Sequence, residues 1–138
     1  MSDHGEIASL VTRVAWMMDH GDVDSFCECW CDDARLHHST VDGHVTAKAG
    51  REIREMAQET FGNPQYAAFK SLHIVNNPVI DIDGDRARAR YYVTHTLMGP
   101  GARPVGVEKC DTWLRKCADG KWRIESLEEV QLLDYSKR

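Results

Sequence analysis

The sequence predicts an α+β domain with three helices in the first half of the chain and an antiparallel sheet in the second half. In the first third, apolar residues recur at steps of three and four, the period of a helix that buries one face. From residue 71 onward, apolar and polar residues alternate, the period of a strand with one buried face. The 138 residues suit a single domain with one core and one pocket. We therefore expect the helices to cover one face of a curved sheet.

Three helices are expected in the N-terminal half of the chain. The first covers about residues 5–20 and ends at Gly21, because glycine readily adopts the conformation that terminates a helix. A short second helix follows with Asp22 or Asp24 as its cap, and residues 62–64 (Gly-Asn-Pro) close the third. Their apolar faces consist of Ile7, Leu10, Val11, Val14, Met17 and Met18, then Val23, Phe26, Cys27, Trp30 and Cys31, then Ile53, Met56, Ala57, Thr60 and Phe61.

Six strands are expected to form the sheet. Two short ones lie between the second and third helices and are joined by a turn at Asp42-Gly43. Pro78 interrupts the next strand and predicts a bulge or a sheet edge, because proline has no N–H group to donate to a neighbouring strand. The expected strands are residues 36–38, 45–47, 71–82, 86–97, 105–116 and 122–130.

Charge and composition argue against several classes of function. The chain has 17 Lys+Arg against 22 Asp+Glu and no basic cluster, which argues against nucleic acid and anionic membranes as partners. No run approaches the ~18 apolar residues of a membrane span. The first six residues lack the basic and then apolar layout of a secretory signal. Five cysteines without such a signal are expected to be reduced, so we expect a cytoplasmic location.

The sequence shows no strong metal motif. Residues 27–31 contain three cysteines, but on a helix the middle one points away from the other two. His37, His38 and His44 flank the first turn without a carboxylate at a fixed spacing. The acidic residues of 81–85 place their glycine wrongly for a calcium loop. We therefore predict no metal and no cofactor.

Asp19 and His73 are candidates for an acid–base pair. Asp19 lies at the end of an apolar helix, where a carboxylate needs a partner. His73 and His95 stand inside strands with apolar neighbours. A carboxylate that pairs with an imidazole fixes its tautomer and leaves the other ring nitrogen free to act as a base. The plainer interpretation is a helix-capping Asp19 and hydrogen-bonded core histidines, and the sequence alone does not place Asp19 next to His73.

Motifs spread over most of the chain share a pattern with a known family. They are Asp19 in the first helix, Asp32-Asp33-Ala34, Gly50-Arg51-Glu52-Ile53, residues 72–80 (LHIVNNPVI), residues 83–87 (DGDRA), residues 111–115 (DTWLR) and residues 119–124 (DGKWRI). Together they resemble SnoaL-like domains of the nuclear transport factor 2-like superfamily over about residues 5–130, with residues 131–138 as a tail. The resemblance implies a single cone-shaped α+β barrel, in which a strongly curved antiparallel sheet and three helices enclose one pocket.

The resemblance also implies roles for particular residues. In dehydratases and a dehydrochlorinase of the superfamily, an aspartate that matches Asp19 orients a histidine that matches His73, and this histidine removes a proton from the substrate. His95 resembles a second histidine, which in scytalone dehydratases assists the leaving hydroxyl. The other residues expected to line or support the pocket are His38, Tyr91, Tyr92 and Trp30.

The chain departs from these relatives in the pocket. Met18 stands where scytalone dehydratases have a tyrosine, and His38 stands at about the position of their second tyrosine. Their pocket asparagine has only residues 110–111 nearby, and residues 128–129 are both glutamate where several relatives carry an arginine. The substrate of any one relative is therefore not expected to carry over, and no residue is assigned to bind an anionic or carbonyl oxygen.

The function that the sequence predicts is cofactor-independent acid–base catalysis on a small, mostly apolar cyclic molecule, as a dehydratase-like lyase or an isomerase or cyclase. His73 would be the general base, oriented by Asp19, and His95 would donate a proton with support from Tyr91 or Tyr92. The alternative is a non-catalytic ligand-binding or interaction module of the same fold, such as a structural subunit of an oxygenase. Epoxide hydrolysis would need two carboxylates and an arginine around one water, a grouping that the sequence does not show. Because the relatives are mostly dimers or trimers, a homodimer or homotrimer is expected.

Overall fold

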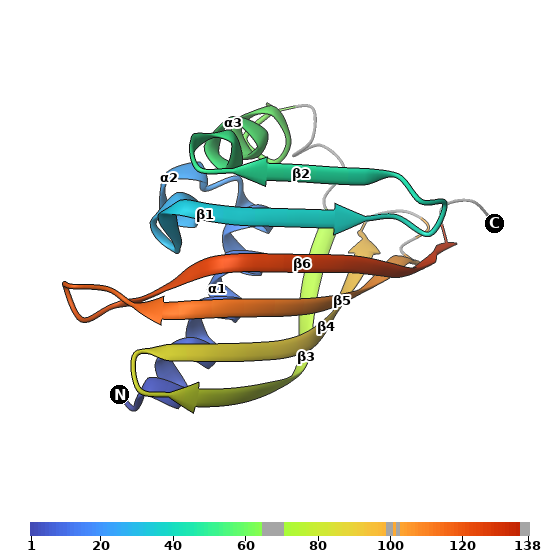
Figure 1. The fold of residues 1–138 in the computed structure, drawn as a ribbon. Helices are drawn as coiled ribbons and strands as arrows, with labels where there is room; N and C mark the ends of the chain where they lie inside the picture. The colour runs from blue at the N-terminus through green and yellow to red at the C-terminus, as the bar shows by residue number, and fades with distance from the viewer. Residues whose placement is uncertain (65–70, 99–100, 102, 136–138) are drawn as a thin grey trace.

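The computed structural model describes residues 1–64, 71–98, 101 and 103–135. Three helices and six strands lie within these ranges (Figure 1). They are α1 (Asp3–His20), α2 (Val23–Glu28), β1 (Trp30–Ser39), β2 (Val45–Ala49), α3 (Arg51–Glu59), β3 (Ser71–Asp83), β4 (Arg86–Leu97), β5 (Arg103–Lys116) and β6 (Trp122–Asp134). None of the helices in these ranges has the length and apolar character needed to cross a bilayer.

The strands form one sheet in the order β2-β1-β6-β5-β4-β3 (Figure 1). The sheet is curved but open, with β2 and β3 at its edges. Four of the neighbouring pairs are antiparallel, whereas β1 and β6 run parallel. The prediction of a wholly antiparallel sheet is therefore wrong at this one pair. Strands that are distant in the sequence are not joined by a tight turn, so local patterning carries no signal for their relative direction.

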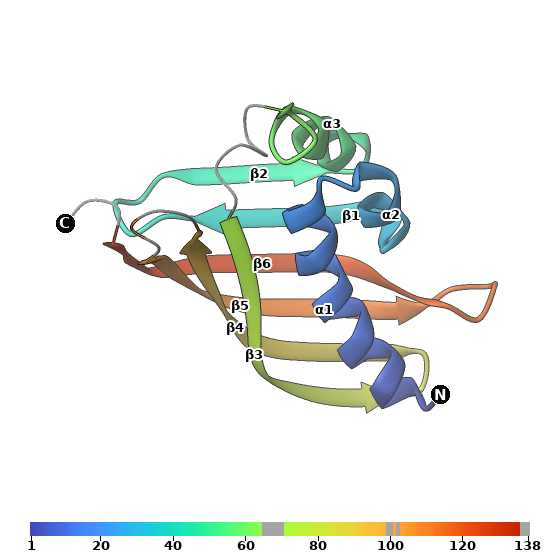
Figure 2. The same cartoon turned by 180° about the vertical axis from the view of Figure 1, so that it is seen from behind.

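α1 crosses one face of the sheet, and no helix of the described residues lies on the opposite face (Figure 2). Side chains at helical spacing on α1 pack against inward side chains of the strands and form the core. α3 lies beside the β1–β2 end of the sheet (Figure 2). The core includes Ile7, Leu10, Val11 and Val14 from α1, and Ala87, Ala89, Leu114 and Ile124 from the sheet.

The second helix ends earlier than the sequence predicts, and the first strand begins earlier. Asp22 caps α2 by accepting a hydrogen bond from the Ser25 backbone at 3.1 Å, as expected for one of the two candidate caps. The Ile124 backbone donates to the carbonyl of Cys29 at 2.8 Å. Because of this bond with the last strand, β1 begins at Trp30, although the position of Trp30 continues the apolar spacing of the helix.

The last strand is longer than expected. Residues 131–134 were expected to begin a tail, but Gln131 pairs with Glu108 and Leu133 with Val107 of β5. These pairings extend β6 to Asp134. Residues 136–138 of the expected tail lie outside the described residues.

β3 bends at a bulge that confirms the interruption predicted at Pro78. Asn76 pairs with Tyr92 and Val79 with Arg90, so two residues of β3 stand opposite one residue of β4. One of the two, Asn77, has a positive φ of 49°. The bend turns the first half of β3 toward the C-terminal end of α1 (Figure 2).

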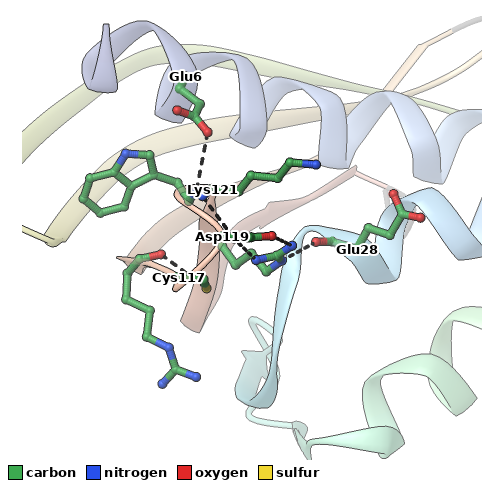
Figure 3. A network of polar contacts seen from close by, with 8 residues as sticks. Glu6, Glu28, Cys117, Asp119 and Lys121 are labelled. Carbon is green, nitrogen blue, oxygen red and sulfur yellow. Dashed lines mark hydrogen bonds and ion pairs between the residues drawn. The ribbon is translucent and has the colours of Figure 1, made fainter.

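The β5–β6 hairpin is tied to both N-terminal helices (Figure 3). The Asp119 carboxylate accepts two hydrogen bonds from the Arg123 guanidinium, at 3.0 and 2.8 Å. Arg123 Nε also donates to the carbonyl of Glu28 at the end of α2, at 3.2 Å. On the other side, the Trp122 backbone donates to Glu6 of α1 at 3.4 Å. These contacts hold the start of β6 beside the start of β1.

Candidate active site

Asp19 and His73 form a buried pair where α1 meets β3. His73 Nδ1 lies 2.7 Å from Asp19 Oδ1, and the His73 backbone N–H donates to both carboxylate oxygens at 3.1 Å. The side chain of Asp19 is 7% exposed and that of His73 is 13% exposed. Because an ionised carboxylate only accepts hydrogen bonds, the proton of this contact lies on Nδ1 of the imidazole. The pairing anticipated from Asp19 is thus present in the structure.

The end of α1 places Asp19 where its charge needs a partner. Gly21 ends the helix in the left-handed conformation, with φ of 69°, and its N–H bonds back to the last turn. A carboxylate in that turn faces the negative end of the helix dipole, which is unfavourable. The two N–H groups of His73 compensate for this position. The Asp19 carboxylate at the end of α1 is therefore stabilised only when β3 packs beside it.

His95 packs directly against His73. The two residues are register partners on β3 and β4, and their rings stack with centroids 4.3 Å apart and an interplanar angle of 16°. His95 Nε2 is buried and has no hydrogen-bond partner among the described residues. Burial, and then the nearby His73, lowers the pKa of His95, which favours its neutral form. His95 thus supports one face of the His73 ring, and its expected role as a proton donor stays a prediction.

A cavity of about 100 Å³ opens beside this pair, between α1 and the sheet. Its wall is mostly apolar, with His73, Glu108 and Glu129 among its polar side chains. Its volume is below the ~300 Å³ at the lower end of sites for drug-sized ligands, so it suits a small ligand. Other residues in its wall are Val14, Met18, Phe26, Trp30, Tyr91 and Cys110.

Of the predicted aromatic pocket residues, two line the cavity and one does not. Trp30 and Tyr91 are buried and line it, and the Tyr91 hydroxyl lies 2.9 Å from Thr112 Oγ1. Tyr92 is 48% exposed on the opposite face of the sheet, because successive side chains of a strand point to opposite sides. The expectation that Tyr92 contributes to the pocket is therefore corrected.

Two glutamates that the sequence does not predict as site residues line the cavity. Glu108 and Glu129 come from the neighbouring strands β5 and β6 and hydrogen-bond to each other. His38 of β1 is the register partner of Glu129, and its Nε2 lies 3.4 Å from Glu108 Oε1. His38 thus contacts the pair formed by Glu108 and Glu129, but it is not among the described residues that line the cavity. One signal was available for Glu108, because it shares the inward alternation of Cys110, Thr112 and Leu114.

The side chains of His38, Glu108 and Glu129 shift one another's pKa values. Burial, and then the hydrogen bond with Glu108, raises the pKa of Glu129 well above its ordinary range. Burial opposes ionisation of Glu108 too, but hydrogen bonds with His38 and Glu129 outweigh it and lower its pKa to about 2. The hydrogen bond with Glu108 raises the pKa of His38. One donor atom from each of the three lies within 4.8 Å of the others, so a proton or a cation must separate the two carboxyl groups.

A larger depression, of about 720 Å³, lies near α2 and α3 and has a different character. Its wall contains several arginines, three of which have carboxylate partners at 2.7 to 2.9 Å. The Asp19–His73 pair does not line it. The smaller cavity is therefore the candidate active site. The three ion pairs are Arg54–Asp24, Arg115–Asp33 and Arg123–Asp119.

Comparison with known proteins identifies similar folds. The family model described as SnoaL-like domain matches residues 1–128. An NTF2-like protein from Novosphingobium aromaticivorans with a cystatin-like fold is 22% identical, with a TM-score of 0.77, over 94% of this chain and 82% of its own. A proposed dehydratase of the NTF2-like family from Streptomyces avermitilis is 16% identical, with a TM-score of 0.75, over 95% and 97%. A proposed aromatic ring hydroxylase from N. aromaticivorans is 24% identical, with a TM-score of 0.76, over 95% and 90%. At these identities the likeness is one of fold, and no curated protein matches the chain.

Proposed function

Because this chain belongs to the SnoaL-like domain family, whose fold includes dehydratases and cyclases, we propose that it is a cofactor-independent acid–base enzyme of the lyase or isomerase type. Its substrate is a small, mostly apolar cyclic molecule with a C–H group next to a carbonyl or similar activating group. The observation that carries the proposal is the 2.7 Å contact between Asp19 and His73 at the wall of a small apolar cavity.

His73 acts as the general base. Its Nε2 removes the proton beside the activating group, while the carboxylate of Asp19 stabilises the imidazolium that forms. Stacking on His95 and the bond to Asp19 hold the ring in one orientation, so little reorganisation accompanies proton transfer. The carbanion or enolate then expels a leaving group, or is protonated at another atom. These outcomes correspond to elimination and isomerisation.

Replacement of Asp19 tests the proposal. Asp19→Asn keeps the shape of the side chain but removes the charge that fixes the imidazole, so the rate of proton abstraction is expected to fall by about 10⁴-fold. The measurement is deuterium incorporation from D₂O into a panel of small cyclic ketones, followed by NMR. Tyr92→Phe is the matched control, because Tyr92 is exposed on the other face of the sheet.

Each outcome of this experiment selects a function. Exchange by the wild type and by Tyr92→Phe, with loss in Asp19→Asn, supports general-base catalysis. Equal exchange in the wild type and Asp19→Asn contradicts it. Binding of the ketones without exchange in any of the three favours the alternative, a ligand-binding module, which the small apolar cavity would also suit.

A further inference from the structure

The glutamate pair and His73 share one cavity. His73 is on the edge strand β3, Glu108 on β5 and Glu129 on β6, and all three side chains line the same cavity. The curvature of the sheet turns these strands around a common space. A molecule in the cavity would therefore contact the base and the two carboxyl groups at the same time.

The geometry of the glutamate pair favours one shared proton over two negative charges. Two ionised carboxylates in hydrogen-bond contact inside an apolar cavity repel each other strongly, and a shared proton removes the repulsion. His38 Nε2 faces Glu108 at 3.4 Å, and the side chain of Glu108 is 18% exposed. This contact favours the ionised form of Glu108, so the proton resides on Glu129. The direction of each pKa shift agrees with this assignment.

The other polar groups near the cavity are less suited to donate a proton. The Tyr91 hydroxyl is engaged with Thr112 at 2.9 Å, and burial raises its pKa far above neutrality. His95 favours its neutral form and its Nε2 is buried without a partner among the described residues. No lysine or arginine is among the described residues that line the cavity. Among the described side chains that line the cavity, a carboxylic acid is the remaining proton donor.

We propose that Glu129 is the general acid of this cavity, and that it protonates a hydroxyl group leaving the substrate. The inference rests on the proposed function and names the substrate class as a cyclic β-hydroxy carbonyl compound. His73 takes the proton from the carbon next to the carbonyl, and that electron pair forms the C=C bond. The C–O bond breaks with its electrons, and the proton of Glu129 completes a water molecule. The proton gained by His73 equals the one lost by Glu129, and exchange with solvent restores both groups.

Infrared spectroscopy tests where the proton resides without any substrate. At pH 7 the wild type is expected to show the C=O band of a neutral carboxylic acid, which shifts in D₂O. Glu129→Gln should lack this band, whereas Glu128→Gln should keep it, since Glu128 is the exposed neighbour on the same strand. Absence of the band from the wild type, or its survival in Glu129→Gln, overturns the proposal. A stoichiometric divalent metal bound to the purified protein and lost in Glu129→Gln also overturns it.

Kinetics separate the acid from the base. The probes are 3-hydroxycyclohexanone, for loss of water, and cyclohexanone, for exchange of the α-proton. Glu129→Gln is expected to slow elimination by about 10²–10⁴-fold and to slow exchange much less, whereas Asp19→Asn slows both. Equal slowing of both reactions in Glu129→Gln indicates a structural role and contradicts the inference. If the wild type acts on neither probe, the proposed reaction fails on this substrate class, and with it the catalytic role of Glu129.

Discussion

At the scale of single residues, the charge of each carboxyl group at the cavity is set by a specific hydrogen-bond partner. Asp19 sits at the unfavourable end of a helix dipole and is held by the ring and backbone N–H groups of His73. Glu108 is held ionised by His38, and Glu129 is held neutral by Glu108. These partners come from different elements, so the protonation state of the site depends on the assembled fold.

The glutamate pair predicts a dependence of stability on pH. Glu129 has a raised pKa in the folded protein, so its contribution is complete below about pH 4.5 and is lost as the unfolded chain ionises at higher pH. Above pH 4.5, the free energy of unfolding of the wild type should therefore fall relative to that of Glu129→Gln, by up to ~1.4 kcal/mol per pH unit. Urea denaturation between pH 5 and 7 measures the difference.

Glu108 gives the opposite dependence in acid. Its folded pKa of about 2 lies below its ordinary value of 4.5, so its contribution is present above pH 4.5 and is lost as pH falls toward 2. Glu129→Gln retains Glu108, and both proteins should lose stability in this lower range. For the prediction about Glu129, the contrary result is a wild-type stability curve that runs parallel to that of Glu129→Gln from pH 5 to 7. It would show that Glu129 is ionised in the folded state.

The sequence predicts some site residues and not others for physical reasons. Asp19 was recognisable because a carboxylate on an apolar helix end demands a partner. Tyr92 was misplaced because neighbouring tyrosines on a strand look alike in composition while they face opposite sides. The proximity of Glu129 to Glu108 depends on strand register and sheet curvature. The sequence showed only that residues 128–129 are both glutamate where several relatives carry an arginine.

At the scale of elements, the backbone at the junction between α1 and α2 lies close to the backbone of Phe61. Gly21 has a φ of 69°, and a β-carbon there would lie 2.9 Å from the Phe61 carbonyl oxygen. Gly21→Ala should therefore cost the ~1–2 kcal/mol of a left-handed residue and the cost of the clash in addition. Gly43→Ala is the matched control, because Gly43 has a φ of 86° and nothing within 4 Å of its added carbon. Equal losses of stability in urea would show that the approach to Phe61 does not matter.

Most elements followed from local periodicity, and the errors lie where distant strands intervene. The alternation of β4 predicted its bounds as 86–97, which the structure confirms. The start of β1 at Trp30 was missed because it depends on a backbone bond between Cys29 and Ile124. The parallel pairing of β1 with β6 was missed for the same reason. Contacts between such distant positions leave no periodic trace in either segment.

At the scale of the whole molecule, one face of the sheet is not covered by the described helices (Figure 1), and it carries large apolar side chains. Ile74, Tyr92 and Trp113 are each more than a third exposed there. We propose that a second copy of the chain covers this face, which would give the homo-oligomer expected from the family resemblance.

Sedimentation equilibrium tests this association. The wild type should sediment as a dimer or trimer, and Tyr92→Glu should shift it toward monomer because it places a charge on the covered face. Trp16→Glu is the matched control, since Trp16 is 64% exposed on α1 and lies away from this face. A wild-type monomer, or equal effects of the two substitutions, would contradict the proposed interface.

The parallel β1–β6 pair has a consequence for how the chain is made. β1 is the first strand to be synthesised, whereas its inner neighbour β6 is the last. A nascent chain that ends before Trp122 therefore lacks the strand that joins the N-terminal hairpin to the meander, and it also lacks Glu129 of the cavity wall. Pairing over so great a sequence separation makes folding slow and leaves the apolar face of α1 uncovered in the meantime. We expect the site to form only after synthesis of the last strand, in one cooperative step with closure of the sheet.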